Sequence, residues 1–459
     1  MRAHVVLEDG FHLVGEAFVG EGQVSGEVVF NTAHTGYQEV LTDPSYTGQA
    51  VVFTYPLIGS IGVNPEDAES SRIAPAALIV REYVPRPSNW RATMSLADWL
   101  KETGVIGVHQ IDTRALVRHL RQAGSLKGII ATIDGDLDDA AREELARKAA
   151  ASPGVVGQDL VRLVGTKKAY EYVPGRGVVP AGSGRSAQAH ARAKLEAMAQ
   201  AHAGTQAHAE TEARAGTGAQ AETQAHAETQ AKAHAHAHTH THTQIQAWRE
   251  AQAEAETKAP AHKAAHLAVL DCGVKRSVLD SLAGLGCRVT VLPPTTPAQD
   301  ILTMGVQAVI VSNGPGDPTT LGYIVQTVDQ LLGRVPVLGI CLGHQIVAQA
   351  LGLPVYRLKF GHHGGNHPVK ELATGRVEIT SHNHGFAVAV PGDANEFTVR
   401  RPTGPVRALV THRSLYDGTV EGLALPELNV YTFQYHPEAG PGPHDARGHF
   451  ARFLERIGV

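Results

Sequence analysis

Cys341 is flanked by Gly339 and Gly343, the spacing of a nucleophile elbow. An apolar stretch precedes the cysteine and a helical pattern, residues 344–351, follows it. The thiol is therefore expected on a tight, strained turn at the carboxyl end of a sheet. A thiolate in such a position attacks carbonyl carbons and forms thioesters. The alternative is a small buried hydrophobic residue, as most free cysteines are. The strand, helix and glycines favour the nucleophile.

A thiol nucleophile needs a base, and the base needs a group that orients it. His436 and Glu438 follow a strand-like run, residues 430–433. Residues i and i+2 of an extended segment point to the same side, so Glu438 is expected beside His436. The pair alone is weak evidence, because the chain has 26 histidines. The order of strand, elbow cysteine and late strand makes a Cys341, His436 and Glu438 triad the prediction.

Acyl transfer also needs donors for the developing oxyanion. The backbone N–H of Leu342, directly after the cysteine, is one candidate. Gly314 and Gly316 follow the apolar run 308–311 and let the backbone approach a substrate. A simple tight turn after a strand explains these two glycines equally well.

The region from residue 266 to 459 alternates short apolar runs with helical patterns. This alternation is typical of a doubly wound, mostly parallel sheet. Strands are expected at 267–270, 288–292, 308–311 and 335–340, and helices at 274–285, 297–304 and 320–332. The predicted fold class is α/β, with the nucleophile elbow inside this second domain.

Residues 1–150 are predicted to form a separate mixed α/β domain. Short β-type runs occur at 5–7, 27–30, 50–54 and 77–80, separated by Gly- and Pro-bearing turns. Helical patterns follow at 95–100, 112–120 and about 137–150, and Asp112 is the expected N-cap of the second.

Residues 151–265 are interpreted as the connection between the two domains. Within it, about 186–260 is a low-complexity insert of Ala, His, Gln, Glu and Thr. Few large apolar residues are present to offset the entropy of ordering, so no stable fold is required there. Five alternating histidines at 234, 236, 238, 240 and 242 are similar to an affinity tag and should bind divalent metal weakly.

The composition excludes several function classes. A formal net charge of -5 over 459 residues gives no reason to expect nucleic acid or a membrane surface as a partner. No apolar run is long enough for a spanning helix. Three cysteines form no secreted disulfide framework and suit a reducing cytosol, so a cytoplasmic location is expected.

Together these features resemble the triad (class I) glutamine amidotransferases, which couple glutamine hydrolysis to use of the ammonia elsewhere. The chain is more similar still to the small subunit of carbamoyl-phosphate synthetase. Further motifs carry that likeness: Phe360-Gly361-His362-His363-Gly364-Gly365-Asn366-His367, Ser381-His382-Asn383-His384-Gly385-Phe386, Pro437-Glu438-Ala439-Gly440-Pro441-Gly442, Thr35-Gly36-Tyr37-Gln38-Glu39 and Ile111-Asp112-Thr113-Arg114. Cys272 departs from the family, which usually has Phe there, and is expected to fill a small buried site.

The resemblance implies a catalytic triad of Cys341, His436 and Glu438 and an oxyanion hole from Leu342 and Gly316. It implies glutamine contacts from Ser45, Gly314, Gly316, Leu342, Gln345, Asn383, Gly385 and Phe386. It also implies ammonia transfer to a large subunit that uses ATP, Mg²⁺ and bicarbonate, in a heterodimer or an assembly of heterodimers, for arginine and pyrimidine biosynthesis. This chain has no G-x-x-x-x-G-K-[ST] phosphate loop and is expected to hold no cofactor itself.

Three alternatives remain at this level. His362, His363 and His367, or His382 and His384, are possible metal ligands, but no carboxylate at ligand spacing accompanies them, so no metal is expected. A glutaminase subunit of another synthetase is disfavoured by the N-terminal region. A catalytically silent regulatory subunit is disfavoured by the intact Cys341, His436 and Glu438.

Overall fold

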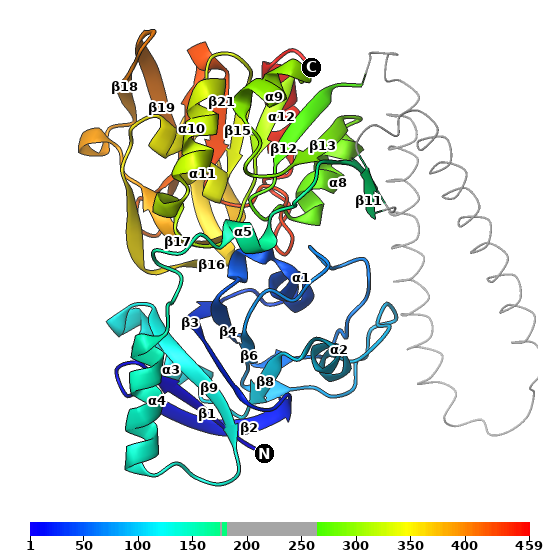
Figure 1. Ribbon diagram of the computed structural model, residues 1–459, viewed down its shortest axis with the longest axis vertical. Helices are drawn as coiled ribbons and strands as arrows, with labels where there is room; N and C mark the ends of the chain where they lie inside the picture. Colours follow the sequence, from blue (N-terminus) through cyan, green and yellow to red (C-terminus); the bar gives the residue numbers. More distant parts are fainter. Residues whose placement is uncertain (175–176, 181–263) are drawn as a thin grey trace, which may run out of the picture. The chain divides into compact units, whose positions relative to one another are not determined.

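The computed structural model describes residues 1–174, 177–180 and 264–459. The low-complexity insert and its five alternating histidines lie outside the described residues, which Figure 1 draws in colour. The predicted domain boundaries at 150 and 265 stay predictions. Among the described helices, none is both long and apolar enough to cross a membrane.

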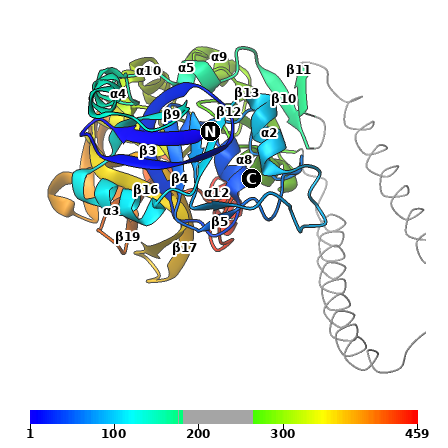
Figure 2. The ribbon, with the colours of Figure 1, turned by 90° about the horizontal axis from the view of Figure 1, so that it is seen from below.

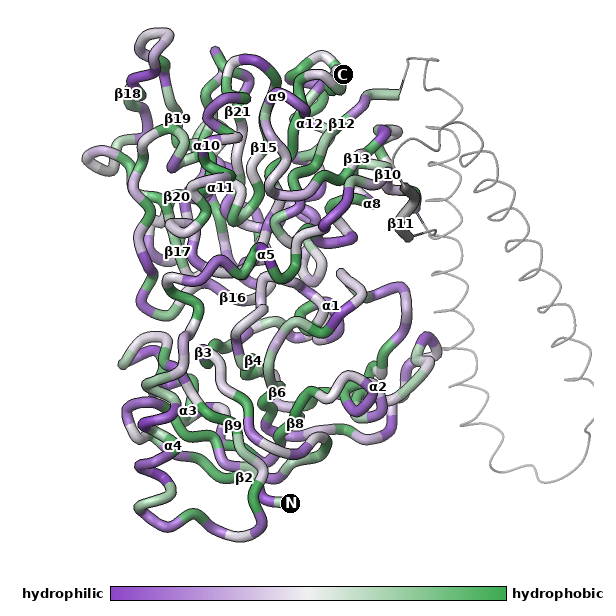
Figure 3. Tube along the Cα trace, viewed as in Figure 1, coloured by the Kyte–Doolittle hydropathy of each residue, from purple (hydrophilic) through white to green (hydrophobic). Residues whose placement is uncertain are grey.

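The N-terminal residues form a closed barrel whose strand order is β1-β2-β8-β6-β4-β3-β9. The first strand pairs with the last, antiparallel, which closes the barrel. Hydrophobic residues alternate along the strands and fill the interior, and Figures 2 and 3 show the strands and their hydropathy. The strands are β1 Arg2–Leu7, β2 His12–Val19, β3 Gln23–Asn31, β4 Gln49–Phe53, β6 Ala77–Ile79, β8 Ile106–His109 and β9 Leu126–Ile133.

Side-chain caps begin three of the helices around the barrel, whereas the helix after Gly36 begins without one. The side chain of Asp112 accepts a hydrogen bond from the Ala115 N–H at 2.9 Å, which confirms the predicted N-cap. Ser95 and Asp138 cap the next helices in the same way. The helices are α1 Tyr37–Thr42, α2 Leu96–Thr103, α3 Thr113–Ala123 and α4 Asp139–Ala151, and a small sheet pairs β5 Leu57–Ile58 with β7 Glu82–Tyr83.

Five parallel strands form the centre of the C-terminal sheet, in the order β13-β12-β14-β15-β21. This arrangement confirms the predicted doubly wound α/β fold. The strands are β12 His266–Leu270, β13 Arg288–Leu292, β14 Ala308–Val311, β15 Val337–Ile340 and β21 Val430–Phe433.

Antiparallel strands extend this sheet at both edges, and the sequence patterns had not indicated them. Beyond β21 lie β20 Val420–Leu425, β19 Gly404–Ser414, β16 Val355–Glu371 and β17 Val377–Val388, and β18 Glu396–Arg401 pairs with β19. Beyond β13 lie β10 Tyr170–Val173 and β11 Gly177–Pro180, after the short helix α5 Val161–Val164.

Helices cover both faces of the parallel strands (Figure 1). Alternate strand residues point to opposite faces, so Leu270 packs in one hydrophobic core and Val269 in the other. One face is covered by α9 Ala298–Thr303, α10 Gly322–Leu331 and α11 Leu342–Ala350, and the other by α8 Arg276–Gly284 and α12 Gly448–Arg456. The C-terminal helices predicted from sequence begin and end within two residues of these bounds.

The elbow between β15 and α11 depends on two glycines. A Cβ on Gly343 would lie 2.0 Å from the carbonyl oxygen of Val311, and one on Gly339 would lie 2.7 Å from the carbonyl oxygen of Gly343. Neither approach leaves room for a side chain. The glycines therefore let the helix begin directly over the strand ends, as the sequence predicted.

A Gly343→Ala variant should be less stable by about 1–3 kcal/mol or more, because its new methyl group overlaps backbone that cannot move freely. Urea unfolding followed by circular dichroism measures the change. Gly284→Ala is the matched control, since a Cβ there meets nothing within 4 Å and alanine favours the helix. Equal stability of the two variants would contradict this account of the elbow.

Candidate active site

Cys341 is the N-cap of α11 and has φ 53° and ψ −103°, a backbone conformation that residues other than glycine rarely adopt. A residue that merely fills a core has no need of such strain. Its Sγ lies 3.5 Å from the carbonyl oxygen of Asn383, and the residue lines a cavity although it is only 2% exposed. The structure thus places the thiol where the elbow pattern predicted it.

His436 and Glu438 lie together in the buried interior, next to the elbow. The Nδ1–H of His436 donates to Oε1 of Glu438 at 2.6 Å. The backbone N–H of His436 donates to the carbonyl of Ser381 at 2.8 Å, which fixes the loop after β21 to β17. The carboxylate therefore orients the imidazole and sets its tautomer. The predicted contact is confirmed, but Pro437 and Glu438 lie in a turn and not on the extended segment that was expected.

The charge balance of this pair favours the imidazolium. Burial alone would lower the pKa of His436, but Glu438 and Cys341 outweigh burial and raise that pKa to about 10. Burial would raise the pKa of Glu438, but Lys275 and His436 hold it well below its usual range. His436 is therefore protonated and Glu438 ionised at neutral pH.

The other imidazole nitrogen, Nε2 of His436, makes no hydrogen bond of ordinary geometry to any described residue. Cys341 is nevertheless among the groups that raise the pKa of His436, so its thiol lies near the ring. Catalytic contacts of this kind are often long before substrate binds. The arrangement leaves Nε2 available for a proton transfer.

All eight residues predicted to contact glutamine line one cavity together with Cys341. Glu27, Gln49, Val155, Arg357, His363 and His384 complete its wall, and the predicted residues are Ser45, Gly314, Gly316, Leu342, Gln345, Asn383, Gly385 and Phe386. Leu342 and Gly316, the predicted oxyanion donors, are thus on the same wall as the thiol. Their roles in binding and catalysis stay predictions.

The N-terminal half supplies part of this wall through a few buried polar contacts. Asn313 donates through Nδ2 to Oγ of Ser45 at 3.1 Å. Asn383 donates through Nδ2 to Oδ2 of Asp43 at 2.9 Å and accepts through Oδ1 from Nδ1 of His363 at 2.9 Å. Sequence reasoning found Ser45 and Asn383 from the resemblance but missed Asp43, Asn313 and His363.

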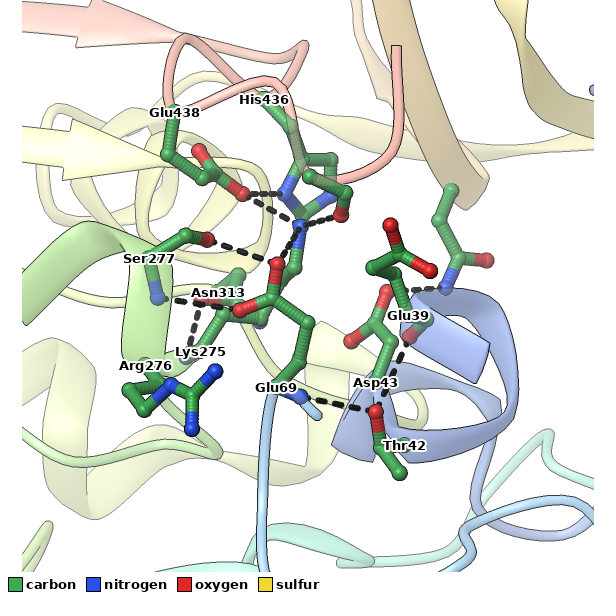
Figure 4. A network of polar contacts seen from close by, with 12 residues as sticks. Glu39, Thr42, Asp43, Glu69, Lys275, Arg276, Ser277, Asn313, His436 and Glu438 are labelled. Carbon is green, nitrogen blue, oxygen red and sulfur yellow. Dashed lines mark hydrogen bonds and ion pairs between the residues drawn. The ribbon is translucent and has the colours of Figure 1, made fainter. Parts of the chain in front are cut away.

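Lys275 is the most consequential residue that sequence reasoning missed (Figure 4). It is only 1% exposed, and its Nζ lies 2.8 Å from Oε1 of Glu438 and 3.7 Å from Oε1 of Glu69. It also donates to the carbonyl of Gly440. Glu69, from the N-terminal half, in turn accepts hydrogen bonds from the backbone and hydroxyl of Ser277. Lys275 thus neutralises the carboxylate that orients His436.

Cys272 fills a small buried site, as expected from the sequence. It is fully buried, and burial raises the pKa of its thiol, which keeps it protonated and unreactive. Its backbone N–H donates a hydrogen bond to the hydroxyl oxygen of Ser312 at 3.0 Å.

Histidines and carboxylates gather at two further places in the described chain at distances suited to a metal ion. The groups are His362, His382, His384 and Glu421, and Glu378, His412 and His449. Glu421 is the carboxylate that sequence spacing failed to associate with the histidine motifs.

Family models match both halves of the chain. Residues 5–130 match the CPSase domain of the carbamoyl-phosphate synthase small chain, and residues 268–456 match the class-I glutamine amidotransferase domain. The chain belongs to the carbamoyl-phosphate synthase small-chain family.

Curated relatives are similar over almost the whole of this chain. A carbamoyl phosphate synthase small chain from Syntrophotalea carbinolica is 42% identical over 99% of this chain and 97% of its own. A chloroplastic one from Arabidopsis thaliana is 38% identical over 99% of this chain and 85% of its own. A solved glutamine amidotransferase from Thermotoga maritima is 20% identical, with a TM-score of 0.30 over 42% of this chain and 80% of its own.

The raised pKa of His436 predicts a pH-dependent contribution to stability. Its ordinary pKa is 6.5 and its folded pKa is about 10, so the stabilisation is complete below pH 6.5 and is lost as pH rises through 10. The destabilisation caused by His436→Gln should therefore shrink between pH 6.5 and 10. Urea unfolding of both proteins across this range measures it.

His344→Gln is the control for that experiment. Burial lowers the pKa of His344 to about 3, so this histidine is neutral in the folded state throughout the range. Its unfolded state is also neutral above pH 7.5, and the effect of its substitution should be constant there. A constant effect of His436→Gln would mean that His436 is not held as an imidazolium.

Proposed function

We propose that this chain hydrolyses glutamine to glutamate and supplies ammonia to a carbamoyl-phosphate synthetase large subunit. The observation that carries the proposal is the elbow thiol of Cys341 beside the His436–Glu438 pair. The family membership and the cavity wall shared by both halves of the chain support it.

In the first half-reaction the Cys341 thiolate attacks the carboxamide carbon of glutamine, and the carbonyl oxygen becomes an oxyanion. The N–H groups of Leu342 and Gly316 stabilise that charge. Gly316 has φ 94°, which turns its backbone in a way that most residues resist. The tetrahedral intermediate collapses, its C–N bond breaks, and the imidazolium of His436 gives a proton to the departing nitrogen. The products are ammonia and a γ-glutamyl thioester.

In the second half-reaction neutral His436 takes a proton from water, and the resulting hydroxide attacks the thioester carbonyl. The same donors hold the second oxyanion. The C–S bond breaks, the thiolate returns, and glutamate leaves, with His436 again protonated. Glu438 remains ionised throughout, because Lys275 and His436 both stabilise its charge.

The large subunit is part of the proposal, together with its ATP, Mg²⁺ and bicarbonate and a heterodimeric or larger assembly. The small-chain family membership implies such a partner. A cytoplasmic location is also proposed here, although one relative is described as chloroplastic.

Cys341→Ser should reduce glutamine-dependent carbamoyl phosphate formation by at least about 10³-fold, because hydroxyl is a far weaker nucleophile than thiolate in this setting. The measurement uses the complex with a large subunit, ATP and bicarbonate, and follows glutamate and carbamoyl phosphate separately. Ammonia supplied directly should restore synthesis by the variant complex.

Cys272→Ser serves as the control, since that cysteine is buried and is not among the residues that line the cavity. It should retain glutamine hydrolysis. A Cys341→Ser chain that still hydrolyses glutamine would refute the nucleophile. Hydrolysis that does not respond to the large subunit would assign the chain to another synthetase, and a silent wild-type chain would favour a regulatory subunit.

A further inference from the structure

A group of four buried side chains lies outside the triad, on the antiparallel part of the C-terminal sheet. His362 comes from β16, His382 and His384 from β17, and Glu421 from β20. One nitrogen of each histidine and one oxygen of Glu421 all lie within 4.8 Å of one another. None of the four is more than 6% exposed. The orientation of each ring decides what this group can bind.

In two of the three rings, the nitrogen that points away from the group donates a hydrogen bond to an oxygen that can only accept. Nδ1–H of His384 donates to the carbonyl of Phe386 at 2.8 Å. Nε2–H of His362 donates to the carboxylate of Asp417 at 2.9 Å. In a neutral ring the other nitrogen then carries a lone pair and no proton. Nε2 of His384 and Nδ1 of His362 are therefore the nitrogens that face inward, and in a neutral ring each of them is an acceptor.

Thr380 selects the tautomer of the third ring, His382, in which the proton is again on the nitrogen that points away from the group. The hydroxyl of Thr380 has one proton, which it donates to the carbonyl of His367 at 2.9 Å. Its oxygen then accepts from Nε2–H of His382 at 2.7 Å. Nδ1 of His382 is left as a lone pair, and it lies 3.0 Å from Nε2 of His384. In the tautomer that the Thr380 donation selects, both of these nitrogens carry lone pairs at this distance.

Glu421 adds a carboxylate to these three acceptors. It is fully buried, and neither of its oxygens has a hydrogen-bond partner in the described part of the chain. Its Oε1 lies 3.7 Å from Nδ1 of His362 and its Oε2 lies 3.7 Å from Nδ1 of His382. Neither 3.7 Å contact is a hydrogen bond, and burying a carboxylate without hydrogen bonds is costly. A cation bound at the centre of the group would compensate both the carboxylate charge and the histidine lone pairs.

We propose that His362, His382, His384 and Glu421 bind a structural zinc ion. Zinc bonds to nitrogen and oxygen at about 2.0–2.1 Å, so its tetrahedral ligand atoms lie about 3.3 Å apart. The 3.0 Å between the ring nitrogens of His382 and His384 and the 3.7 Å from Nδ1 of His362 to Oε1 of Glu421 lie on either side of that value, and all four ligand atoms lie within 4.8 Å of one another. Imidazole ligands favour zinc over calcium or magnesium.

The contacts behind the ligands suit a metal as well. Zinc-binding histidines usually donate their second N–H to a carboxylate, carbonyl or other oxygen, as all three rings do here through Asp417, Phe386 and Thr380. Four protein ligands leave no open position, so the ion is structural rather than catalytic. It holds the strands that carry His363 and Asn383 of the cavity wall.

The second group, Glu378, His412 and His449, does not support the same inference. The guanidinium of Arg452 lies 3.4 Å from Oε1 of Glu378 and from Nε2 of His449. Its positive charge opposes a metal ion there. The proposal for the first group departs from the expectation of no metal, which rested on residue spacing without Glu421.

The test uses the full chain with His234, His236, His238, His240 and His242 replaced by Gln, so that the tract does not bind metal. This parent is loaded with zinc, passed over a sizing column with a weak chelator, and its zinc is measured. About one ion per chain is expected. Adding Glu421→Gln or His382→Gln should lower zinc affinity at least about 100-fold, while His412→Gln should not change it.

X-ray absorption of the zinc-loaded parent gives a second readout that needs no further substitution. Three imidazoles and one carboxylate oxygen at about 2.0–2.2 Å support the site. A parent that retains no more zinc than a folded Glu421→Gln, His382→Gln double variant overturns it, as does a different ligand set. The lone pairs would then be bridged by protons. None of these readouts depends on glutamine hydrolysis.

Discussion

The carboxylate of Glu438 lies fully buried between two cations, His436 and Lys275, at 2.6 and 2.8 Å. Removing an ion from water costs several kcal/mol, which is recovered only when opposite charges and hydrogen bonds replace the lost hydration. Each member of this set therefore depends on the others. Lys275 would not be tolerated at 1% exposure without Glu438 and Glu69, and the imidazolium would not persist without Glu438.

This charge balance also connects the two halves of the chain. Glu69 belongs to the N-terminal half and reaches Lys275, and it accepts from Ser277 at the start of α8. Asp43 and Ser45 reach Asn383 and Asn313 in the same region. The N-terminal half therefore does more than cover the cavity, because its carboxylates balance charges next to the triad. A glutaminase domain lacking this half would need another way to compensate Lys275.

The histidines in the chain illustrate how much orientation matters. A neutral histidine has one protonated and one unprotonated ring nitrogen, and the hydrogen bond that one nitrogen makes determines whether the other donates or accepts. In the motifs of β16 and β17 the rings are fixed by Phe386, Asp417 and Thr380, so that three lone pairs converge on Glu421.

The sequence alone determined the features that depend on neighbouring residues. The elbow at Cys341, the placement of Glu438 beside His436, the Asp112 cap and the doubly wound strands all follow from local spacing, periodicity and backbone sterics. The resemblance added residues such as Ser45, which no local pattern indicates. Closure of the barrel, the edge strands, the Glu69–Lys275–Glu438 chain and the position of Glu421 appeared only in the tertiary structure. Those features join residues far apart in the chain, and whether a buried charge or lone pair is satisfied depends on partners that folding alone brings within a few ångströms.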